Sequence, residues 1–291
     1  MDFNLLVEKV NSLPSLPQAY HKCCHLLEQE VTDSTALAKV VSTDPGMTMA
    51  VLRLVNSAFY SLPRKIERLD HAISIIGQNK FRDLILTASV VEAMSKLAGG
   101  EINMEAFWRH SVLTGLLARR IGLYCYLPNS ERLHIAGLLH DVGQLIYFNL
   151  LGTKALKVCE LVSKLGIEPH VAERKVLGFT SHQVGGALCR AWNLPDWLTE
   201  TVENHHQPDN SERFEQEASV IGLANRLTSQ HFPGITSLGS FNAMDKVQHE
   251  VEEVHTGLNL SSDDIELATE EALEQLDSVL ASLIPELSSV N

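Results

Sequence analysis

Helix-start signals recur along this chain, whereas the apolar–polar alternation typical of strands is scarce. Asp44 stands directly before Pro45, which pairs a capping carboxylate with proline at the first helical position. Much further along, Ser261 or Ser262 is placed to open a final amphipathic helix. The sequence therefore predicts an all-α fold.

Length and composition allow either one large domain or two small ones. The chain has 291 residues and 45% of them are hydrophobic, which is enough for a sizeable core. The pair Gly99-Gly100 is the best boundary candidate in the first half. We expect an N-terminal helical subdomain over residues 1–100 and a multi-helix bundle over 101–291, with an acidic C-terminal helical extension. Residues 231–260 carry little pattern and are expected to form a long loop with partial helix.

Several function classes are disfavoured by composition. The sequence has no run of eighteen apolar residues and no basic leader before an apolar stretch, so we expect no membrane span and no signal peptide. Five cysteines without a C-x-x-C pair suit free thiols in a reducing cytoplasm. The net charge is −13, and residues 207–291 hold 16 acidic but only 3 basic residues. General nucleic-acid binding, which needs a basic surface, is therefore not expected.

The dipeptide His140-Asp141 interrupts an apolar stretch that we expect to form one helix over 131–150. Burying an imidazole beside a carboxylate is costly unless something binds them, and a divalent cation does this well. Further histidines lie on helix faces that continue an apolar stripe or adjoin small residues. We predict one metal site formed by His110, His140, Asp141, His182, His205 and His206.

Imidazoles with a single carboxylate suit iron, manganese, nickel or zinc. Such a metal would lower the pKa of a bound water and take up charge from phosphoryl oxygens, which is the chemistry of metal-assisted phosphohydrolysis. The remaining histidines, His134 and His170 among them, are expected to be surface or packing residues.

The spacing of His110 and His140-Asp141 resembles the HD superfamily of metal-dependent phosphohydrolases, which are all-helical. That family usually has a distant aspartate in a segment like L-A-D-R-L, where this chain has Asn225. A lysine common four residues after the motif histidine is here Gln144. His182 and the His205-His206 pair are similar to the HD-GYP branch, whose GYP signature is absent.

The N-terminal half is similar to the HDOD domain. The likeness rests on Ser42-Thr43-Asp44-Pro45-Gly46-Met47 and Asn56-Ser57-Ala58-Phe59-Tyr60, and it spans roughly residues 10–210. This resemblance implies an HD-type helical bundle in a bacterial signalling protein that has lost catalysis. It implies an output or adaptor role.

Two functions remain open at this point. The first is a non-catalytic signal-transduction module with a partly retained metal site, whose partner is a signalling protein or a small nucleotide. The alternative is a divalent-metal phosphohydrolase acting on a nucleotide or cyclic dinucleotide. Asn225 and Gln144 favour the first, because one removes a ligand charge and the other removes a cation that would hold a phosphate.

One basic run is left outside both readings. It begins at Arg64-Lys65 and continues with Arg68, Lys80 and Arg82. Such a run is typical of a solvated face, with an acidic partner or a nucleotide phosphate as the alternative.

Overall fold

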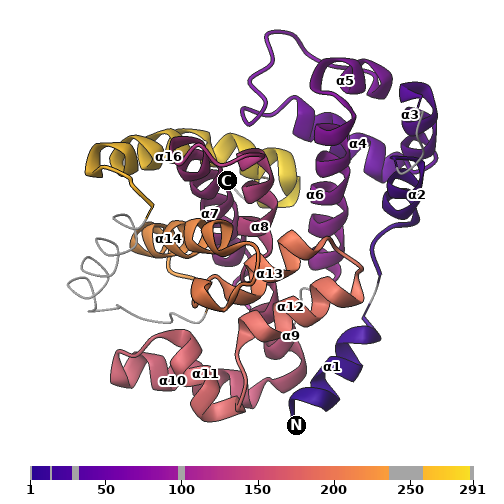
Figure 1. Ribbon diagram of the computed structural model, residues 1–291. Helices are drawn as coiled ribbons and strands as arrows, with labels where there is room; N and C mark the ends of the chain where they lie inside the picture. Colours follow the sequence, from indigo (N-terminus) through magenta and orange to yellow (C-terminus); the bar gives the residue numbers. More distant parts are fainter. Residues whose placement is uncertain (1, 14, 28–32, 98–101, 236–257, 289–291) are drawn as a thin grey trace. The chain divides into compact units, whose positions relative to one another are not determined.

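The computed structural model describes residues 2–13, 15–27, 33–97, 102–235 and 258–288. Every regular element in these ranges is a helix, which confirms the all-α fold (Figure 1). The expected boundary at Gly99-Gly100 and residues 236–257 of the expected loop lie outside the described residues. Within the same ranges, no helix combines the length and apolar character needed to cross a membrane.

The chain divides into two compact units, which we describe separately. Unit 1 comprises Met1–Leu13 and Leu97–Glu274, and unit 2 comprises Pro14–Lys96 and Gln275–Asn291. One long helix, α16 (Ser262–Leu283), belongs to both units.

Unit 2 is built from α2 (Gln18–Leu27), α3 (Ser34–Ser42), α4 (Pro45–Val55), α5 (Leu69–Ile76), α6 (Gln78–Leu97), the end of α16 and α17 (Pro285–Ser288). The expected cap is confirmed, because the backbone N–H of Met47 donates to Asp44 Oδ1 at 3.0 Å. Val51, Phe81 and Ile85 are fully buried and form part of the core of this unit.

Unit 1 holds the histidine-bearing helices. Its elements are α1 (Phe3–Asn11), α7 (Met104–Tyr124), η1 (Ser130–Arg132), α8 (Leu133–Leu139), α9 (Val142–Leu151), α10 (Thr153–Leu165), α11 (Pro169–Leu177), α12 (Ser181–Ala191), α13 (Asp196–Asn204), η2 (Pro208–Asn210), α14 (Glu215–His231) and the start of α16. Helix α7 is buried along most of its length, where it packs against α8 and α14. A helix buried on nearly all sides acts as the centre of a bundle.

Glycines let the backbones of these helices come into direct contact. A Cβ atom added to Gly137 on α8 would lie 2.4 Å from the Cα of Gly115 on α7. A Cβ added to Gly143 on α9 would lie 1.8 Å from the carbonyl oxygen of Ser181, at the start of α12. These two crossings bring the helices that carry His110, His140 and His182 within side-chain reach of one another.

The expectation of one helix over 131–150 is wrong, because the chain leaves the helix at the His140-Asp141 pair. Helix α8 ends at Leu139 and α9 begins at Val142, and Asp141 has φ −104° and ψ 11°. Successive side chains on a regular helix diverge by about 100°. The break at Asp141 instead lets its carboxylate approach the ring of the preceding histidine.

Substituting Gly137→Ala should lower the free energy of unfolding by about 2 kcal/mol or more, since backbone atoms of α7 cannot yield to the added methyl group. The matched control is Gly46→Ala on α4, where the nearest atom to an added Cβ is a side-chain oxygen of Asp44 at 3.3 Å. Urea unfolding of both variants measures the difference. Equal effects of the two substitutions would contradict the close approach of α7 and α8.

Buried His134 should make the stability of the protein depend on pH. Burial penalises its charged form and Arg119 adds repulsion, so its pKa is lowered to about 3 from 6.5. As the pH falls, His134 is therefore protonated in the unfolded chain before it is protonated in the folded chain. The free energy of unfolding falls as the pH drops from 6.5 towards 3. Relative to the variant His134→Leu, the native chain should lose up to about 1.4 kcal/mol per pH unit in that window. Parallel unfolding curves of the two proteins against pH would refute this assignment.

Candidate metal centre

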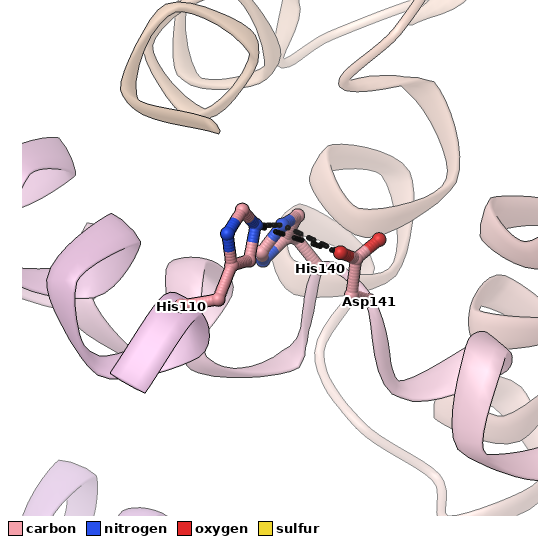
Figure 2. Close-up of side chains that lie close together, drawn as sticks. All are labelled: His110, His140 and Asp141. Atoms are coloured by element: carbon pink, nitrogen blue, oxygen red, sulfur yellow. Dashed lines mark hydrogen bonds and ion pairs between the residues drawn. The ribbon is translucent and has the colours of Figure 1, made fainter. Parts of the chain in front are cut away.

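Two histidines and an aspartate meet inside unit 1. His110 comes from the middle of α7, while His140 and Asp141 form the junction between α8 and α9. Figure 2 shows the two rings and the carboxylate facing one another. Oδ2 of Asp141 lies 3.3 Å from Nε2 of His140 and 3.6 Å from Nε2 of His110, and the two Nε2 atoms are 3.3 Å apart. We call these three residues the triad.

Burial sets the electrostatics of the triad. His110, His140 and Asp141 are only 2%, 0% and 5% exposed. Burial lowers the pKa of His110, and the neighbouring ring of His140 lowers it further. Burial acts in the same direction on His140, but the contact with Asp141 outweighs it and raises that pKa. Burial alone would raise the pKa of Asp141, yet His140 holds it below the ordinary value, so the carboxylate is charged at neutral pH.

Backbone carbonyl groups fix the orientation of three rings. Nδ1 of His110 donates to Phe232 O at 2.7 Å, Nδ1 of His140 donates to Gly137 O at 2.7 Å, and Nδ1 of His205 donates to Val202 O at 2.8 Å. A neutral imidazole carries one N–H, so Nε2 of each ring is left with its lone pair. This is the arrangement by which proteins hold histidine ligands to a metal.

The residues present fit a divalent cation. The lone pairs of His110 and His140 converge with the carboxylate of Asp141, and Oδ1 of Asn225 lies 3.0 Å from Nε2 of His110. Nε2 of His205 is buried and has no hydrogen-bond partner within the described part of the chain. Electron-rich atoms gathered in this way need a positive charge among them, which is either a bound cation or a proton on His140.

The other predicted ligands lie at increasing distance from the triad, with His205 next to His140 and the other two next to His205. The ring centroid of His205 lies 5.2 Å from that of His140. His182 and His206 contact His205, with ring centroids 5.8 Å and 4.3 Å away. Among the described residues, the ligand atoms of the triad all lie within 4.8 Å of one another. His182, His205 and His206 are not part of that group of ligand atoms. With the triad they form a larger group of neighbouring rings, which we call the histidine cluster.

His170 is a member of this cluster that sequence analysis placed among surface or packing residues. Its ring centroid lies 4.7 Å from that of His206 and 6.3 Å from that of His182. It stands at the start of α11, where its neighbours in the sequence give no periodic sign of an inward face.

Glu173, on the same helix, is fully buried and anchors the start of α12. It accepts hydrogen bonds from the backbone N–H of Ser181 at 2.7 Å and from its hydroxyl at 3.0 Å. Burial raises the pKa of this carboxyl to about 7. The position of His182, one residue after Ser181, therefore depends on a buried acid that sequence analysis did not single out.

A short segment after α14 covers the triad. Phe232 supplies the carbonyl group that holds His110, and Ile235 is buried. A Cβ added to Gly234 would lie 3.7 Å from Oδ2 of Asp141. The backbone at Gly234 therefore runs beside the carboxylate, within a stretch that the sequence analysis expected to be a loop with little pattern.

The two positions that depart from the HD pattern also lie at the site. Asn225 on α14 contacts the triad through the amide oxygen described above. Gln144 on α9 is buried, and its Oε1 has no hydrogen-bond partner among the residues that the structure describes.

Comparisons with known proteins agree with this architecture. An HDOD protein of unknown function from Geobacter sulfurreducens is 23% identical, with a TM-score of 0.76 and coverage of 96% of this chain and 98% of that chain. A provisionally named metal-dependent phosphohydrolase from Shewanella amazonensis is 20% identical, with a TM-score of 0.65 and coverage of 96% and 98%. A provisionally named signal transduction protein from Marinobacter aquaeolei is 20% identical, with a TM-score of 0.70 and coverage of 94% and 59%. These likenesses show a shared fold.

Curated relatives from Treponema pallidum and Mycoplasma mycoides are each 23% identical to this chain, over 225 and 203 residues. The chain spans about two fifths of their length, since the matches cover 43% and 39% of them. The model of the HDOD domain family matches residues 13–208, more than half of the chain and close to the span of the resemblance noted above. The chain therefore belongs to the HDOD domain family.

Proposed function

We propose that this chain is a signal-transduction and interaction module whose HD-type triad holds a divalent cation without efficient turnover. The triad supplies two neutral nitrogen ligands and one carboxylate, a set that suits iron, manganese, nickel or zinc. When bound, such an ion would act as a Lewis acid towards a phosphoryl oxygen. Its partner would be a signalling protein or a small nucleotide, and its free cysteines suit a cytoplasmic location.

The observation that carries the proposal is the contact of Asn225 with His110. An amide oxygen stands 3.0 Å from Nε2 of His110, where the HD pattern has a carboxylate. A neutral amide donates weakly to a metal and cannot accept a proton from an attacking water. The site therefore keeps three good ligands but has one negative charge fewer than the hydrolytic pattern.

Gln144 acts in the same direction. A lysine at this buried position would place a cation in the first turn of α9, directly after Asp141, whereas glutamine offers a neutral amide. A phosphate brought to the site would therefore meet less positive charge. Binding without rapid hydrolysis is the behaviour expected of such a site.

Replacing Asn225 and Gln144 by the residues of the HD pattern should create phosphodiesterase activity. The native protein should not hydrolyse bis(p-nitrophenyl) phosphate in the presence of Mn²⁺, while the double variant Asn225→Asp, Gln144→Lys should gain measurable phosphodiesterase activity. Each substitution restores a charge that the HD pattern places at the site. The matched control is Asn225→Gln with Gln144→Lys, which keeps an amide at the ligand position and should stay inactive.

Activity of the native chain would contradict the proposal if the variant His140→Ala abolished it. The protein would then be a working phosphohydrolase despite Asn225.

A further inference from the structure

A pocket lies in unit 2, and its lining includes no residue of the histidine cluster. Its walls come from α4, from residues 65–67 and from the end of α16, and its volume is about 600 Å³. Cavities of this size hold small organic molecules in many proteins. All of its lining belongs to the ranges assigned to unit 2.

The wall formed by residues 65–67 is fixed in advance by one side chain. Nδ2 of Asn56, at the end of α4, donates to Leu52 O at 2.7 Å and to Ile66 O at 2.8 Å. Oδ1 of the same residue accepts from the backbone N–H of Ile66 at 2.7 Å. Ile66 itself is 1% exposed. The pocket is therefore preformed, because two hydrogen bonds tie residues 65–67 to the end of α4 and the third fixes the Asn56 side chain on that helix.

Two cations line this preformed pocket. Nε of Arg53 donates to Ser282 O at 3.4 Å, which orients the guanidinium and leaves its terminal nitrogens available. Within the described ranges, neither Arg53 nor Lys65 has a carboxylate oxygen within 4.0 Å. Glu67 is the one acidic residue of the lining, so the pocket carries a net charge of +1 in a chain of net charge −13.

The rest of the lining is largely apolar. Leu52 and Ala281 supply aliphatic surface, and Met49 lies at the rim with 55% of its surface exposed. Methionine adapts its shape to different apolar ligands. A ligand for this pocket therefore needs an apolar body together with a negative group.

We propose that this pocket binds a small organic anion, with a ring-sized apolar body on Leu52 and Ala281 and a phosphate or carboxylate group paired with Arg53 and Lys65. Fixed guanidinium and ammonium groups recognise both kinds of anion through charge-assisted hydrogen bonds. None of its residues belongs to the triad, so the module would have a second ligand-binding site.

Isothermal titration calorimetry with 1-naphthyl phosphate, 1-naphthoate and uncharged 1-naphthol tests this directly. At least one anion should bind the native protein, and naphthol should bind at least about tenfold more weakly. Comparison of the two anions tells whether phosphate or carboxylate is preferred. Lys65→Gln and Arg53→Gln should each weaken binding of that anion about tenfold, which is the effect of losing one charge-assisted hydrogen bond.

Arg64→Gln is the matched control, because Arg64 is an exposed neighbour in sequence that does not line the pocket; it should change the affinity less than about twofold. Ala281→Trp should fill the pocket and abolish binding. Circular dichroism checks that each variant is folded. If Ala281→Trp does not fold, Lys65→Gln still tests the proposal, because Lys65 is exposed and its substitution leaves the core intact. Absence of binding by both anions, equal affinity for naphthol, or equal loss in Arg64→Gln and Lys65→Gln would overturn the proposal.

Discussion

The gathering of lone pairs and a carboxylate inside a helical bundle is the constraint on which the rest of unit 1 depends. His110, His140 and Asp141 are buried and their electron-rich atoms converge within 4.8 Å. Such an arrangement persists only if a positive charge offsets it and if the helices hold the rings in place. Three backbone carbonyls orient the histidines, and the contact of Gly115 with Gly137 brings α7 and α8 close enough for the rings to meet.

The same site explains why binding and catalysis can separate. Ligand geometry depends on the triad and its carbonyl partners, all of which are present. Hydrolysis also needs charge balance and a group that handles a proton, and these are the features that Asn225 and Gln144 lack. In the function proposed above, this chain keeps the scaffold of a phosphohydrolase while serving as an interaction module, and the pocket of unit 2 is the proposed second ligand site.

Much of this could be predicted from sequence, for reasons that differ between residues. The all-α fold and the cap at Asp44 follow from local signals, which the structure confirms. The rings of His182, His205 and His206 do lie next to the triad, but only the ligand atoms of the triad meet within 4.8 Å among the described residues, so one metal site formed by all six residues stays a prediction. The break at Asp141 was missed, since the apolar run around it has helical periodicity on both sides. His170, Glu173 and Gly234 were missed because their roles arise from tertiary contacts that no local pattern encodes.

The most direct test of the retained cation is metal analysis of protein purified without added metal, combined with anomalous diffraction from its crystals. We predict about one equivalent of a transition metal and an anomalous peak between His110, His140 and Asp141. The variant Asp141→Ala should lose both signals while remaining folded. A native protein with less than about a tenth of an equivalent, and with no peak after soaking in Mn²⁺, would show that a proton alone holds these side chains together.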